Sequence, residues 1–243
     1  MKFNFLEKIT AVEKKDERLE KSEAELQEKI RERINYESLE LENKNIFTPN
    51  VVDSLARLVL KLENKISFYD TILSDDASGR LVSLILRKVI NSRRTKSGQP
   101  LVNTYFLQGG RHGKAVIGRV VEEFIEEKKP FLGKTLLVTE YIESGRSIQR
   151  LMKILEKQKV DFDLAAVSIL YEPKKYPKEL NQRLFYGTVG EAGLDMWGNE
   201  FHSGVKKGVK ISAHPEKSLI SEEVRSARRD AGKVSNELLK LFD

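Results

Sequence analysis

The stretch KTLLVTEYIESGRSIQRLMKIL, residues 134–155, decides the fold. An apolar strand runs through a short polar turn directly into a segment with the periodicity of an amphipathic helix. The turn presents successive backbone N–H groups at the positive end of that helix, and Gly145 lets a ligand approach the backbone. The sequence therefore predicts an anion site at the carboxyl end of a strand in an open α/β sheet.

The alternation of strand and helix continues on both sides of this segment. Strands are predicted over 68–73, 101–107, 134–140 and 163–170, with less regular ones near 184–189 and 209–212. Helices are predicted over 49–63, 79–91, 114–128 and 146–158. This rhythm predicts a parallel sheet with flanking helices, that is, a Rossmann-like α/β core.

Helical extensions are expected at both ends of the chain. Residues 5–44 contain no Gly or Pro and are rich in charge, which predicts one long amphipathic helix. It either packs across its own domain or serves dimerisation or docking to a protein partner. Residues 218–242 predict a second amphipathic helix, whose arginines either line a solvated face or bind nucleic acid or phosphate: Arg225, Arg228 and Arg229. We expect an N-terminal helix over 1–47, an α/β domain over 48–202 and a basic C-terminal segment over 203–243.

The composition excludes several classes of protein. The chain has 243 residues, no cysteine and three scattered histidines, so disulfides, thiolate nucleophiles and Cys-ligated metals are excluded. The longest apolar runs, such as LVSLIL (81–86), are far shorter than the roughly 20 residues that span a bilayer. No signal-peptide pattern follows Met1. We therefore expect a cytoplasmic protein without a membrane span.

Charge is distributed unevenly along the chain. Lys+Arg number 43 and Asp+Glu 37, for a net charge of +6, yet residues 80–119 hold nine basic residues and no acid. This imbalance predicts an anionic partner, either a polyphosphorylated small molecule or nucleic acid. The absence of a DNA- or RNA-binding motif favours the small molecule.

The segment VTEYIESGRS (138–147) resembles the phosphoribosyl pyrophosphate-binding motif of type I phosphoribosyltransferases. In that family a short loop holds the 5′-phosphate, and two acids before it bind the ribose hydroxyls directly or through magnesium. The resemblance implies that Glu140 is the second acid, with a catalytic and metal-binding role, and that Thr139 replaces the first acid. The phosphate loop would then consist of Glu143, Ser144, Gly145, Arg146 and Ser147. We expect Gly145→Val to place a branched side chain in the anion site.

The resemblance extends to FYDTILSDDASGRLVSLILRKV (68–89), which is similar to the first strand, pyrophosphate loop and helix of the family. It implies pyrophosphate contacts from Ser78, Gly79 and Arg80. Asp76 either caps the helix, which we favour, or acts with Asp75 through a metal. The family's mobile basic loop has two candidates, 92–99 and 108–114, and the second contributes Arg111 and Lys114.

The resemblance implies transfer of a phosphoribosyl group to a base-like acceptor with release of pyrophosphate, and Mg²⁺ bound with the substrate diphosphate. A base-binding hood is expected at 190–201, where Trp197 or Phe201 either stacks on a planar ring or packs under the C-terminal helix. Thr139 and the appended helices favour an alternative, a non-catalytic nucleotide sensor that acts through a protein or nucleic-acid partner. A nucleic-acid surface over 80–119 ranks last.

Overall fold

The computed structural model describes residues 22–75, 79–107, 114–190 and 222–243. Its core is a five-stranded sheet in which every neighbouring pair is parallel, in the order β2-β1-β3-β4-β5. The strands are β1 (Thr71–Asp75), β2 (Asn103–Leu107), β3 (Thr135–Ile142), β4 (Phe162–Ile169) and β5 (Leu184–Val189). The predicted parallel α/β sheet is confirmed, and the predicted strand near 209–212 lies outside the described residues.

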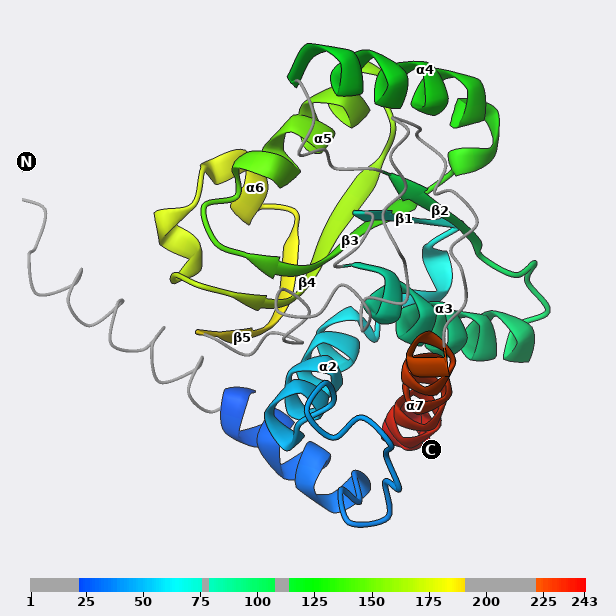
Figure 1. Ribbon diagram of the computed structural model, residues 1–243, viewed down its shortest axis with the longest axis vertical. Helices are drawn as coiled ribbons and strands as arrows, with labels where there is room; N and C mark the ends of the chain where they lie inside the picture. Colours follow the sequence, from blue (N-terminus) through cyan, green and yellow to red (C-terminus); the bar gives the residue numbers. More distant parts are fainter. Residues whose placement is uncertain (1–21, 76–78, 108–113, 191–221) are drawn as a thin grey trace, which may run out of the picture.

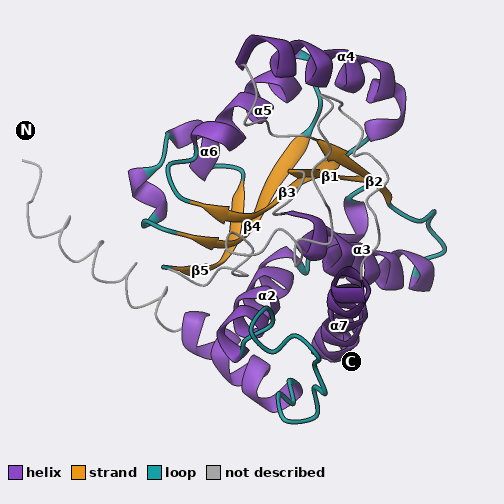
Figure 2. Cartoon of the chain, viewed as in Figure 1, coloured by secondary structure: helices purple, strands orange, loops and turns teal. Residues whose placement is uncertain are grey.

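Helices cover both faces of the sheet (Figures 1 and 2). One face packs on α2 (Pro49–Leu62) and α3 (Gly79–Lys96), and α7 (Glu222–Leu239) packs on α3 in the same apolar cluster. The other packs on α4 (Lys114–Leu132), α5 (Arg146–Lys157) and the short α6 (Lys178–Asn181). Side chains of β3 alternate between the two apolar layers, with Leu136 and Val138 on the α3 side and Leu137 on the α5 side. All eight residues of β4 are buried, as a central parallel strand requires.

Helix α3 is longer than the sequence indicated, and this corrects one prediction. It continues to Lys96, so residues 92–96 are helical rather than part of a basic loop. The reason is Arg94, which is only 5% exposed and donates hydrogen bonds to the carbonyl oxygens of Ser67 and Tyr69 and to Asp70. These partners precede β1, so segment 92–99 lies at the amino edge of the sheet. Of the two candidates for a mobile basic loop, 92–99 is therefore ruled out, and 108–114 lies outside the described residues.

The N-terminal helix is also shorter than predicted. Its described part covers 22–33, and residues 34–48 form turns and irregular backbone, so the expected helix to Lys44 was wrong there. Asn35 explains the end, because its side-chain oxygen accepts hydrogen bonds from the backbone N–H groups of Glu37 and Ser38. The helix packs within its own chain: Ile30 is fully buried against α2, and Glu23 pairs with Arg57.

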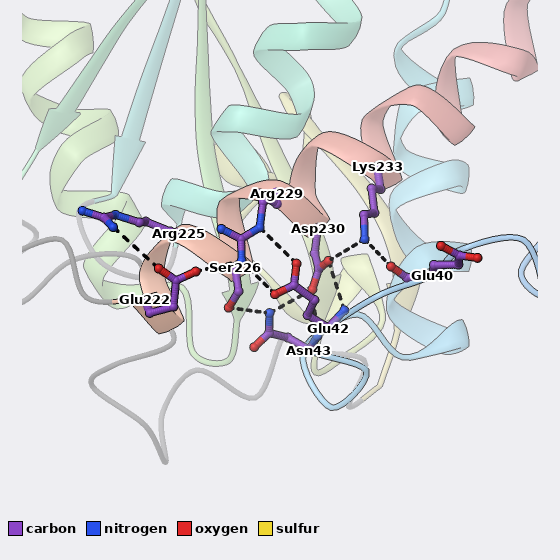
Figure 3. A network of polar contacts seen from close by, with 9 residues as sticks. All are labelled: Glu40, Glu42, Asn43, Glu222, Arg225, Ser226, Arg229, Asp230 and Lys233. Atoms are coloured by element: carbon purple, nitrogen blue, oxygen red, sulfur yellow. Dashed lines mark hydrogen bonds and ion pairs between the residues drawn. The ribbon is translucent and has the colours of Figure 1, made fainter.

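A polar network fastens α7 to the segment that follows this helix (Figure 3). Asp230 is fully buried and accepts hydrogen bonds from the backbone N–H of Asn43 at 2.7 Å, from its side-chain amide at 2.8 Å and from the backbone N–H of Glu42 at 3.2 Å. Arg229 donates two hydrogen bonds to the Glu42 carboxylate and one to Glu222. The hydrogen bond from Arg229 lowers the pKa of Glu42. Arg229 therefore joins two segments that are 187 residues apart in sequence.

Among the described helices, none combines the length and the apolar character needed to cross a membrane.

Candidate functional site at the carboxyl edge of β1 and β3

The strand order places a topological switch point between β1 and β3. The connection after β1 leads outward to β2, whereas the connection after β2 crosses back to β3 on the other side of β1. Connections that depart in opposite directions leave a crevice at the carboxyl ends of the two strands, where open α/β sheets bind ligands. The segments that follow these strands are 76–78, which lies outside the described residues, and 143–145.

Segment 143–147 forms a tight turn into α5. Gly145 is the N-cap with φ +71° and ψ −1°, and no side chain caps the helix. The backbone N–H of Arg146 makes only a long contact of 3.5 Å with Ser144 Oγ. The first amides of α5 are thus left to interact with an anion. The side chains of Glu143, Ser144, Arg146 and Ser147 are all exposed beside these amides.

The space around Gly145 corrects the expectation for Gly145→Val. A Cβ at this position would lie 3.1 Å from Leu180 Cδ1 and 3.6 Å from Tyr176 Cδ1. It would therefore point toward α6, beneath the turn, and not into the anion site. Glycine is required here because of the left-handed backbone conformation, which branched residues adopt only with strain.

Thr139 and Glu140 lie near the end of β3 and are both buried, with exposed fractions of 4% and 1%. The alternation along the strand puts Glu140 on the same face as Leu136 and Val138, the face that α3 covers. Thr139 lies opposite Ala166 of β4 in the ladder. The side chains of Thr139 and Glu140 therefore lie on opposite faces of the sheet, immediately before the turn.

The start of α3 lies directly on these strands. A Cβ on Gly79 would come within 2.9 Å of the Val138 carbonyl oxygen, so only glycine permits this approach. Arg80 follows it and is 9% exposed, with its guanidinium 4.4 Å from the centroid of the Phe106 ring on β2. This cation–π contact directs Arg80 toward β2. The structure thus brings Gly79, Arg80 and Glu140 to the same end of the sheet.

Several predicted site residues cannot be placed beside these. Ser78, Arg111, Trp197 and Phe201 lie outside the described residues, and of Lys114 only its position as the first residue of α4 is described. In the described part of the chain, no three Asp, Glu or His side chains gather into a metal site. The roles predicted for all of the site residues stay predictions.

One residue of the site was missed by sequence reasoning. Tyr176 is 7% exposed, and its hydroxyl donates a hydrogen bond of 2.8 Å to the carbonyl oxygen of Ile142, the last residue of β3. The same hydroxyl accepts a hydrogen bond of 3.2 Å from the backbone N–H of Tyr171. No sequence signal marks this contact, because the partner is a backbone carbonyl 34 residues away.

Comparison with known proteins gives little beyond the geometry. No family model and no curated protein matches the chain. Among solved structures, the chain is similar to the crystal structure of orotate phosphoribosyltransferase from Aeropyrum pernix, with 14% sequence identity and a TM-score of 0.34. The match covers 60% of this chain and 74% of that chain. A TM-score of 0.34 is too low to assign a fold from this similarity, so the α/β fold is assigned from the sheet itself.

Proposed function

We propose that the edge between β1 and β3 binds phosphoribosyl pyrophosphate or a related nucleotide, and that the protein transfers the phosphoribosyl group to a base-like acceptor. One observation carries the proposal. At the switch point α5 begins at Arg146 without a side-chain cap, directly after the left-handed Gly145, and the buried acid Glu140 lies shortly before this turn. Amides at such a helix start suit a phosphate monoester, and a carboxylate beside it suits sugar hydroxyls. The resemblance of 138–147 to the phosphoribosyl pyrophosphate motif supports the choice of ligand.

In this proposal the 5′-phosphate lies on residues 143–147 and the ribose lies near Thr139 and Glu140. The diphosphate then faces the start of α3, where Arg80 supplies positive charge. A nitrogen of the acceptor attacks the anomeric carbon while the bond from that carbon to the pyrophosphate oxygen breaks, and pyrophosphate leaves with the electron pair. The protein's contribution is to orient the ligand and to stabilise the charge that develops on the leaving group.

Magnesium enters this proposal together with the diphosphate. Mg²⁺ keeps several waters and is bound through one or two carboxylates plus substrate phosphates, and it does not require a protein cage of its own. In this proposal Glu140, near the end of β3 and next to the phosphate turn, would supply that single carboxylate. When bound with the ligand, the ion neutralises charge on the departing pyrophosphate.

The burial of Glu140 favours a second candidate, a non-catalytic nucleotide sensor. At 1% exposure its carboxylate is enclosed beneath α3, and Thr139 brings no charge to a metal. A site of this kind binds the phosphate and the sugar without stabilising the leaving group. Helix α7, which packs on α3, and the N-terminal helix, which packs on α2, would then transmit the occupied state to a partner.

The experiment that separates the two functions measures pyrophosphate release from phosphoribosyl pyrophosphate with a panel of purine and pyrimidine bases. A transferase releases pyrophosphate with at least one base, and Glu140→Gln, which keeps the side-chain shape, abolishes release while ribose 5-phosphate still binds. Binding without release for every base would support the sensor. Full activity of Glu140→Gln would contradict the role proposed for this carboxylate.

A further inference from the structure

The carbonyl group of Ile142 is held by two hydrogen bonds. It accepts one from the backbone N–H of Leu170 at 2.9 Å and one from the Tyr176 hydroxyl at 2.8 Å. A carbonyl oxygen has two lone pairs, so this group is fully satisfied. Both donors belong to the segment after β4, on the side of β3 that faces away from β1.

This arrangement fixes the peptide that joins Ile142 to Glu143. In a trans peptide the C=O and N–H groups point in opposite directions. Because the Ile142 carbonyl points toward β4, the N–H of Glu143 points to the other side, toward the carboxyl end of β1. That N–H group is the first amide of the proposed phosphate turn, and it forms no hydrogen bond with any described residue.

Tyr176 also supports the turn from below. Its ring lies under Gly145, where a Cβ would be 3.6 Å from Tyr176 Cδ1 and 3.1 Å from Leu180 Cδ1. The side chain of Tyr176 thus bonds the Ile142 carbonyl and lies beside Gly145 from a single position next to α6, which lies next to the start of α5 (Figure 1). A tyrosine suits this position because its ring packs in the apolar space beneath Gly145, while its hydroxyl bridges the Ile142 carbonyl and the Tyr171 N–H.

We propose that Tyr176 is a positioning residue, which holds the 142–143 peptide so that the amides of the turn converge on an anion at the end of β1. This inference rests on the proposed function for its ligand, a phosphate monoester. It goes beyond that function because Tyr176 touches no ligand atom and acts only through the orientation of the backbone. Its hydroxyl, rather than its bulk, is the active feature.

The test compares Tyr176→Phe with Tyr171→Phe in the full chain. The first variant removes the bridging hydroxyl and keeps the ring. The second is a matched control, because Tyr171 is 43% exposed and contributes only its backbone N–H to the bridge. Nuclear magnetic resonance without ligand gives the order parameters of the Glu143, Ser144 and Gly145 amides, and titration with ribose 5-phosphate gives the affinity.

In Tyr176→Phe we expect the order parameters of these amides to fall from about 0.85 to about 0.6 or below. The affinity for ribose 5-phosphate falls about three- to ten-fold, the range for loss of one hydrogen bond. The control changes neither. Unchanged order parameters in Tyr176→Phe, or altered order with unchanged affinity, would overturn the positioning role. If the wild type binds no ribose 5-phosphate, the proposed function fails, and the ligand-free order parameters still decide the role of Tyr176.

Discussion

Gly79 packs so closely on Ser74 that a Cβ on the glycine would lie 2.4 Å from Ser74 Oγ. The same Cβ would lie 2.9 Å from the carbonyl oxygen of Val138, so the first residue of α3 touches both strands of the switch point. This contact sets the height of α3 above the sheet. Since Glu140 lies on the same face of β3, the contact also sets the space around the buried acid.

Replacement of Gly79 by alanine tests this packing. We expect Gly79→Ala to lower the free energy of unfolding by about 1–3 kcal/mol, because the added methyl group displaces the start of α3 from backbone that cannot yield. Urea unfolding measures the effect. Gly118→Ala is the control, since Gly118 lies in α4 with nothing within 4 Å of its Cβ position. The control is expected to be neutral or stabilising by up to about 1 kcal/mol, and equal stability of the two variants would contradict the close approach.

Two glycines with positive φ allow the effect of backbone strain on stability to be compared with its effect on ligand binding. Gly145 has φ +71° and Gly98 has φ +68°, so alanine at either position costs about 1 kcal/mol of unfolding free energy. Gly145 lies in the proposed phosphate turn, whereas Gly98 lies after α3 at the amino edge of the sheet. The Cβ of an alanine at position 145 would point toward α6, so we expect Gly145→Ala to act through its strained backbone, which displaces the amides of the turn. Only this variant is then expected to weaken ribose 5-phosphate binding in a calorimetric titration. Equal affinity of both variants would show that the turn is not the phosphate site.

The link between the two ends of the chain depends on Asp230. We expect Asp230→Asn to lower the free energy of unfolding by about 2–3 kcal/mol, because the new amide group faces the N–H donors of Glu42 and Asn43. Asp161→Asn provides a control of the same chemistry at an exposed ion pair with Lys134, where the expected loss is below about 1 kcal/mol. Thermal unfolding of both variants measures the difference. A loss in Asp230→Asn no larger than in the control would contradict the role of the network.

The pair of Glu42 and Arg229 predicts a dependence of stability on pH. The folded-state pKa of Glu42 is lowered by its hydrogen bond from Arg229, so the pair stabilises the fold above the ordinary pKa of a glutamate. That contribution is lost as the pH falls through the lowered pKa. We therefore expect Arg229→Gln to be less stable than the wild type at about pH 7, with the difference shrinking toward about pH 2. A difference that grows on acidification would contradict this assignment.

The sequence predicted the parts of the fold that depend on local pattern. The apolar run before Glu143 and the periodic helix after Gly145 fixed β3, the turn and α5 to within two residues. The N-cap at Thr48, whose side chain accepts a hydrogen bond from the Val51 N–H, depends in the same way on neighbouring residues. Such features depend on neighbours in the chain, and their signals lie in the sequence itself.

The parts that were missed depend on partners far apart in the chain. Arg94 was read as one of a cluster of basic residues that face an anion, but it is buried against backbone carbonyls 25 and 27 residues away. No sequence pattern marks Tyr176, because its hydroxyl bonds a backbone carbonyl and every residue has one. The helix end at 33 depends on Asn35, a residue whose side chain competes for backbone N–H groups. The residue types arginine, tyrosine and asparagine do not by themselves indicate which of these contacts the side chain makes.

The central claim is that the edge between β1 and β3 binds a phosphoribosyl ligand, and calorimetry tests it most directly. The purified protein is titrated with phosphoribosyl pyrophosphate in the presence and absence of Mg²⁺, and with ribose 5-phosphate as the control that carries a single phosphate. We expect both ligands to bind, phosphoribosyl pyrophosphate more tightly and with a dependence on Mg²⁺, and Gly145→Ala to weaken both. Absence of heat for both ligands, with or without Mg²⁺, would contradict the claim.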